Sequence, residues 1–137
     1  MKGKNDMRVF FAIFLISLGS VSPLVAGEQK APFRKVVDIA YRGRDTKDDY
    51  VNSQCRLDLY LPLQKTDFAT VVWFHGGGLR GGNRKSAEAF AKRFTGEGYG
   101  VVLVGYRFSP KVKAPAYIDD AAAAVAWTLK NIAKYKG

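Results

Sequence analysis

Residues 70–84, with the sequence TVVWFHGGGLRGGNR, carry the strongest structural signal in this chain. It opens with an unbroken run of β-branched and aromatic residues, Val71 to Phe74, which is too short for a helix and is typical of a strand buried on both faces. Such strands belong to parallel sheets. Gly76, Gly77 and Gly78 follow, and their missing side chains leave backbone N–H groups bare where the strand ends. Because ligands bind beyond the carboxyl ends of strands in open α/β sheets, this glycine loop is the first candidate site.

A helix and a second buried strand follow the glycine loop. Apolar residues at Ala87, Phe90, Ala91 and Phe94 recur at helical spacing, which predicts one apolar helix face. The sequence GVVLVG at 100–105 predicts the next buried strand. Strand, helix and strand in this order form a right-handed βαβ unit, so we expect the centre of the sheet to be parallel.

The flanking segments complete the expected domain. Residues 33–41 and 54–61 are strand-like, and polar residues 42–53 between them predict a solvated linker. Pro115 opens the last helix. Its spacing predicts a buried stripe made of Ile118, Ala122, Val125, Leu129 and Ile132.

Two chemistries use a glycine loop of this kind. Gly76, Gly78 and Gly81 match G-x-G-x-x-G, the dinucleotide fingerprint, which also needs an acidic residue about 20 residues further on. The second strand ends without one, and only Arg107 could serve, for a 2′-phosphate. Acyl transfer instead uses a His-Gly-Gly-Gly loop whose N–H groups bind a tetrahedral oxyanion. His75 fits this second chemistry and has no role in the first.

Three ordered motifs carry a family resemblance: HGGG at 75–78, YRFSP at 106–110 and PAYIDDA at 115–121. From Val36 to the C-terminus the chain resembles the N-terminal half of an α/β-hydrolase of the esterase/lipase group, closest to secreted carboxylesterases and to acetyl-xylan or feruloyl esterases. The resemblance implies an α/β fold in which an antiparallel strand pair precedes a parallel β-α-β-α run.

The same resemblance assigns roles to residues. It implies that Gly77 and Gly78 form the oxyanion hole, that His75 and Gly76 orient the loop, and that Arg107 and Asp120 form a structural salt bridge. Asp119 and Asp120 are adjacent in a helix and point about 100° apart, so they do not form an acid/base pair. The implied substrate is a small-molecule or polysaccharide-linked ester, with no cofactor and no metal.

The sequence contains no G-x-S-x-G nucleophile motif. Ser109 precedes a proline and lacks flanking glycines, Ser86 suits a helix cap, and Ser53 lies in the expected linker. His75 stands before the oxyanion glycines, whereas the catalytic histidine of such hydrolases comes last. We therefore expect a fragment of a serine ester hydrolase that ends before its nucleophile strand and is inactive alone. The alternatives are a non-catalytic or decayed hydrolase-like module and, more distantly, a dinucleotide-binding oxidoreductase fragment.

The N-terminus has the layout of a secretory signal peptide. Lys2, Lys4 and Arg8 precede an apolar run at 9–18 and a small-residue end at 25–27. We expect residues 1–27 to be cleaved near Gly27/Glu28, leaving a partial hydrolase domain at 28–137 in the periplasm or medium without a stable membrane anchor. The formal charge is +10, but the basic residues are dispersed, which argues against nucleic acid. Cys55 is the only cysteine and alternates with leucines, which predicts a core thiol.

Overall fold

The structure is a computed structural model that describes residues 32–43 and 47–137, so the predicted signal peptide lies outside the described residues. Within these described residues, four strands form one sheet. They are β1 (Phe33–Ala40), β2 (Arg56–Pro62), β3 (Thr70–Phe74) and β4 (Gly100–Val104). The helices are α1 (Asp49–Gln54), α2 (Glu88–Gly96) and α3 (Ala116–Asn131), with short 3₁₀ turns η1 (Arg84–Ala87) and η2 (Ile132–Tyr135).

The sheet has the order β1-β2-β4-β3. β1 pairs antiparallel with β2, β2 pairs antiparallel with β4, and β3 pairs parallel with β4. An antiparallel pair therefore precedes a parallel β-α-β-α run, as the α/β-hydrolase resemblance implies. Every residue of β4 is buried, which explains its unbroken apolar sequence. Within the described residues β3 has one neighbour only and is an edge strand, so its predicted burial on both faces is wrong: none of its residues is fully buried, and Trp73 is 38% exposed.

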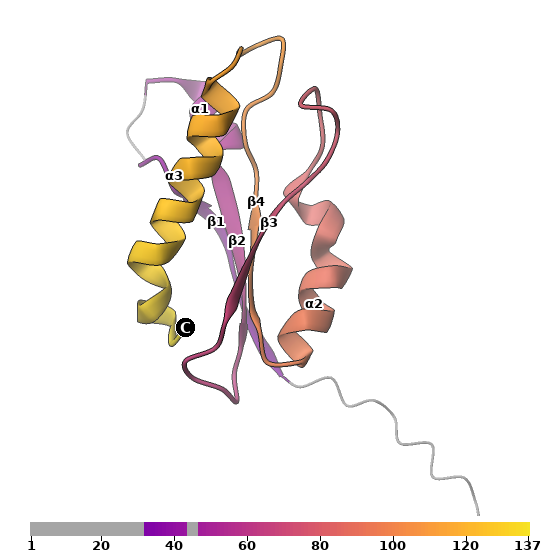
Figure 1. The fold of residues 1–137 in the computed structure, drawn as a ribbon, viewed down its shortest axis with the longest axis vertical. Helices are drawn as coiled ribbons and strands as arrows, with labels where there is room; N and C mark the ends of the chain where they lie inside the picture. Colours follow the sequence, from indigo (N-terminus) through magenta and orange to yellow (C-terminus); the bar gives the residue numbers. More distant parts are fainter. Residues whose placement is uncertain (1–31, 44–46) are drawn as a thin grey trace, which may run out of the picture.

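The two faces of the sheet carry different helices (Figure 1). Leu57, Leu59, Val102 and Val104 pack on the face that α3 covers, together with Ala124. The opposite face is covered by η1 and α2, and there Ala87 and Ala91 pack on Tyr60, Val101 and Leu103. Both faces of β2 are thus buried, and the polar Asp58 is fully enclosed.

The predicted linker at 42–53 is wrong for its second half. Residues 49–54 form α1, because the Asp48 carboxylate accepts hydrogen bonds from the N–H groups of Tyr50 and Val51 and caps the helix. Val51 is buried against the core. This segment is therefore part of the packed domain.

The predicted apolar stripe of α3 is wrong for four of its five residues, because only Ile132, in η2, packs against the core. Ile118 is 60% exposed and Leu129 77% exposed, and Val125 is exposed as well. The buried positions are Asp120, Ala124 and Thr128, spaced four residues apart. A fixed ion pair at Asp120 and the small side chain of Ala124 decide which side of the helix meets the sheet. No helix in the described part of the chain is long and apolar enough to cross a membrane.

Candidate active-site loop

The glycine loop begins at His75, directly after the carboxyl end of β3. A second loop follows β4 and rises from the same end of the sheet (Figure 1). Two hydrogen bonds join the loops: the Tyr106 hydroxyl donates to the His75 carbonyl at 2.6 Å, and the Ser109 N–H donates to the Leu79 carbonyl at 2.8 Å. The loop after β4 therefore holds both ends of the HGGGL segment.

Three consecutive residues of the glycine loop adopt positive φ: Gly77 at 131°, Gly78 at 61° and Leu79 at 59°. A side chain at Gly77 would also overlap the Gly81 carbonyl, whereas a Cβ at Gly78 would meet open space. The sequence alone does not distinguish the two glycines, but the fold requires glycine more strongly at Gly77 than at Gly78. Within residues 32–43 and 47–137 the N–H groups of Gly77 and Gly78 donate no hydrogen bond.

His75 lies inside the loop and is 4% exposed. Its Nδ1 is 2.9 Å from the Gly76 carbonyl oxygen. Because a carbonyl only accepts, Nδ1 carries the proton in this arrangement. The imidazole stacks on Tyr106, with ring centroids 4.5 Å apart, and meets the edge of Phe108 at 5.6 Å. These contacts make His75 a brace for the loop, and they also fix Gly76 through its carbonyl.

Gly82 closes the loop from its other end. Its φ is 128°, and a Cβ there would overlap both the His75 ring and the Gly76 carbonyl. A pocket of about 210 Å³ lies beside this contact. Its lining includes His75, Gly82, Arg84 and Ser53, but neither Gly77 nor Gly78.

Arg107 and Asp120 form the pair that the resemblance implied. Asp120 is fully buried and accepts hydrogen bonds of 2.8 Å from Arg107 Nε and Nη2 and one of 3.2 Å from the Arg107 N–H. Arg42 Nε adds a second positive charge 2.7 Å from Asp120 Oδ1. Burial raises the pKa of Asp120, but the bonds from Arg107 and both positive charges outweigh burial, so the net pKa is lowered. The pKa of Arg107 is raised, chiefly by its hydrogen bonds to Asp120.

None of the serines considered above forms a nucleophile–base pair. The hydroxyl of Ser53 donates to the Tyr50 carbonyl at 3.1 Å, and that of Ser86 donates to the Asn83 carbonyl at 2.7 Å. Ser109 uses its backbone N–H to hold the glycine loop. Cys55 is 1% exposed, and burial raises the pKa of its thiol to about 11. Such a thiol is a poor nucleophile at neutral pH.

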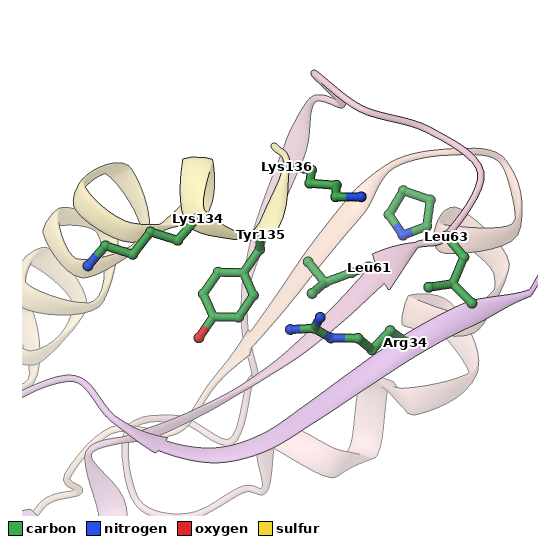
Figure 2. A pocket seen from close by; sticks show the side chains of 7 residues that line it. Arg34, Leu61, Leu63, Lys134, Tyr135 and Lys136 are labelled. Atoms are coloured by element: carbon green, nitrogen blue, oxygen red, sulfur yellow. The ribbon is translucent and has the colours of Figure 1, made fainter.

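A second pocket, of about 100 Å³, lies at the other end of the sheet (Figure 2). It is lined by Leu61 to Leu63, and β2 runs opposite to β3, so this pocket is at the amino end of β3, away from the glycine loop. Figure 2 shows Arg34 beside the Tyr135 ring, and the guanidinium carbon is 5.6 Å from the ring centroid. This pocket takes no part in the candidate site.

The sequence motifs assign no role to Tyr106, Asp58 or Arg84. Asp58 interrupts an apolar strand in LDLYLP, and Arg84 follows directly after the glycine loop. An acidic residue in a strand covered on both faces needs a basic partner. Asp58 within an apolar strand therefore predicts a basic partner, but the sequence does not indicate which arginine supplies it.

Comparisons with known proteins agree with this geometry. The BD-FAE family model matches residues 57–137. The carboxylesterase NlhH of Mycobacterium tuberculosis is 35% identical over 77 residues, which are 56% of this chain and 24% of the relative. The FAD-linked oxidoreductase pytB of Aspergillus terreus is 34% identical over 84 residues, 60% of this chain and 10% of the relative.

Among solved structures, esterase B from Lactobacillus rhamnosis superposes with a TM-score of 0.63 and 25% identity, over 77% of this chain and 32% of that protein. The chain thus spans about a third or less of the length of these relatives. The family model covers more than half of the chain and includes the glycine loop, the Arg107–Asp120 pair and three of the four strands. The chain belongs to the BD-FAE family of α/β-hydrolases.

Proposed function

We propose that this chain is the first part of a serine ester hydrolase and supplies its oxyanion-hole loop. The observation that carries the proposal is the loop after β3, where Gly77 and Gly78 keep free N–H groups in a left-handed backbone braced by His75. Two such donors stabilise the charge that develops on an ester carbonyl oxygen during attack. The names of relatives support the reaction class: carboxylesterase for NlhH and esterase B for the solved structure.

The nucleophile and its base would come from residues outside this sequence. The 137 residues contain no G-x-S-x-G, and His75 is committed to the loop. The chain alone should therefore show no turnover of an ester. The proposed substrate is a small-molecule or polysaccharide-linked carboxylic ester, and the acyl and alcohol groups are left open.

The experiment begins with the DNA downstream of codon 137. We expect an in-frame G-x-S-x-G within about 30 residues, followed by an acidic residue and a histidine. The complete protein should hydrolyse an aryl acetate, and Gly77→Ala should lower kcat by roughly 100 to 1000-fold while KM changes little. Gly96→Ala is the control, because a Cβ there meets open space on α2. Wild-type turnover in Gly77→Ala would remove the loop from the mechanism.

The alternative hypothesis, a dinucleotide-binding oxidoreductase fragment, is supported by the name of one relative, the FAD-linked oxidoreductase pytB. The sequence supports it poorly, because β4 and the residues directly after it offer no acidic side chain to bind a ribose, although the helical segment of η1 and α2 does begin close after the glycines, at Arg84. We expect calorimetry at about millimolar NAD, NADP or FAD to detect no binding. A micromolar dissociation constant would reverse the ranking of the two functions.

Export is proposed on the sequence of residues 1–27 alone. Mass spectrometry of protein from the periplasm or medium should find an N-terminus near Glu28. Recovery with Met1 or Lys2 still attached would contradict a cleaved signal peptide.

A further inference from the structure

Arg84 links the end of the glycine loop to the sheet. It is the first residue of η1 and its side chain is 16% exposed. Its Nε lies 3.1 Å from Asp58 Oδ1, as an ion pair rather than an aligned hydrogen bond, and its Nη2 donates to Asp38 Oδ1 at 3.0 Å. One guanidinium therefore spans two strands, β2 and β1.

Asp58 depends on this arginine. Its side chain is fully buried on the α2 face of β2, and among the described residues Arg84 is its one ion-pair partner. The Asp38 N–H donates to Asp58 Oδ1 at 2.8 Å, while Asp58 Oδ2 has no hydrogen-bond partner in the described part of the chain. A buried carboxylate that loses its cation is strongly destabilised, so Arg84 is held at this place.

Asp38 accepts the hydrogen bond from Arg84 Nη2 at an irregular point of β1. It has a φ of 60° and lies in the irregular register of β1 between Val36 and Ile39. At this break in the β1–β2 ladder, the Asp38 N–H donates to the Asp58 carboxylate, and the Asp38 carboxylate accepts from Arg84. The position of Arg84 is thus fixed by two carboxylates and not by one.

Two residues before Arg84, Gly82 lies so close to the His75 ring and the Gly76 carbonyl that a Cβ there would overlap both. The neighbouring Gly81 carbonyl lies where a side chain at Gly77 would be. The outgoing half of the loop, 81–84, therefore packs directly on its incoming half, 75–77. Fixing one half in space fixes the other.

We propose that Arg84 is a positioning residue for the glycine loop. Through Asp58 and Asp38 it sets where residues 81–84 return to the sheet, and through Gly81 and Gly82 it holds the arrangement of His75, Gly76 and Gly77. The value of that arrangement for catalysis rests on the proposed function. The arrangement itself is measurable without any ester.

His75 makes the measurement simple, because it is the only histidine in the chain. Its imidazole ¹⁵N signals report the tautomer, and the Gly76 carbonyl requires the proton on Nδ1. In the full chain we expect this tautomer in the wild type and its loss in Arg84→Gln, together with displaced amide signals for 76–82. Arg84→Lys, which keeps a charge for Asp58, should restore the Nδ1–H tautomer.

The control is Arg93→Gln, which removes an exposed arginine of α2 paired with Glu97 at 3.3 Å and should leave His75 unchanged. If Arg84→Gln is less stable but keeps the His75 tautomer and the 76–82 signals, Arg84 only stabilises the fold and the proposal is overturned. If Arg84→Gln does not fold, the double variant Asp58→Asn/Arg84→Gln decides, since it removes the arginine without leaving a buried carboxylate unpaired. Displaced Gly81 and Gly82 signals support the proposal there, and unchanged signals overturn it.

This readout is independent of catalysis. An esterase test that fails while His75 responds as expected would remove the proposed function and leave the positioning role in place. If the complete protein hydrolyses esters but His75 does not respond to Arg84→Gln, the positioning role of Arg84 is removed and the proposed function stays in place.

Discussion

Helices α2 and α3 cover opposite faces of the same sheet, but they differ in how well their apolar spacing predicts which residues are buried. α2 buries the residues that its apolar spacing selects, with Ala91 fully buried and Phe90 and Phe94 packed on the core. α3 leaves its large aliphatic residues Ile118, Val125 and Leu129 exposed, and its buried positions are a carboxylate, an alanine and a threonine. The buried carboxylate of Asp120, held by Arg107 and Arg42, thus lies on the side of α3 that meets the sheet, which the apolar spacing of the helix does not predict.

The largest effect should come from breaking the ion pair of α3. Asp120→Ala leaves Arg107 and Arg42 without their shared buried carboxylate, so we expect the free energy of unfolding to fall by about 3 to 5 kcal/mol. Urea unfolding of the full chain measures this. Asp119→Asn, one residue away and exposed, is the control. A loss similar to that of the control would mean that packing alone orients α3.

Acid removes the same charge without removing the side chain, so its effect should be smaller. The pKa of Asp120 is lowered in the fold, so its stabilising contribution is present above the ordinary value of 3.8 and is lost as the pH falls through the lowered value. Unfolding measured from about pH 6 to about pH 2 should show this loss in the wild type and a shallower one in Asp120→Asn. Equal slopes would contradict the assignment.

Enlarging a buried alanine of α2 tests the other helix. Ala91→Leu forces extra methylenes between α2 and the sheet and should cost about 1 to 3 kcal/mol. Ala122→Leu makes the same change on the exposed side of α3 and should stay within about 0.5 kcal/mol. Chemical denaturation of both variants is the measurement. Equal costs would erase the difference between the two helices.

The smallest effect should come from the exposed residues of α3. Leu129→Ser alters a side chain that is 77% exposed, so the free energy of unfolding of the full chain should change by at most about 0.5 kcal/mol. A loss above about 2 kcal/mol, the range for a buried leucine, would show that this side chain is packed in solution.

Sequence patterns predicted the parts of this molecule that depend on local spacing. The strands around Val71 and Val101, the α2 face and the turn into the last helix at Pro115 all follow from short-range periodicity. The same patterns place the glycine loop at the carboxyl end of β3, and its role as an oxyanion hole stays a prediction.

What the patterns missed depends on contacts between distant residues. The role of Asp58 follows from Arg84, 26 positions later in the chain, and the rotation of α3 follows from Arg107 and Arg42. The cap at Asp48 that begins α1 was local, but it was hidden in a stretch of charged residues. Charged pairs carry no periodic signal, so only the fold reveals which charges meet.

The buried thiol of Cys55 can report how often the core of this chain opens. Its sulfur lies in the core among Tyr41, Leu57 and their neighbours, and a pKa of about 11 keeps it a thiol at neutral pH. A disulfide reagent can therefore modify it only in molecules whose core has opened. Cys55 is the only cysteine, so all labelling reports this one position. At low reagent concentration the labelling rate reports the equilibrium population of the open state, and at high concentration it reports the rate of opening. Both can be measured in native buffer for every variant above.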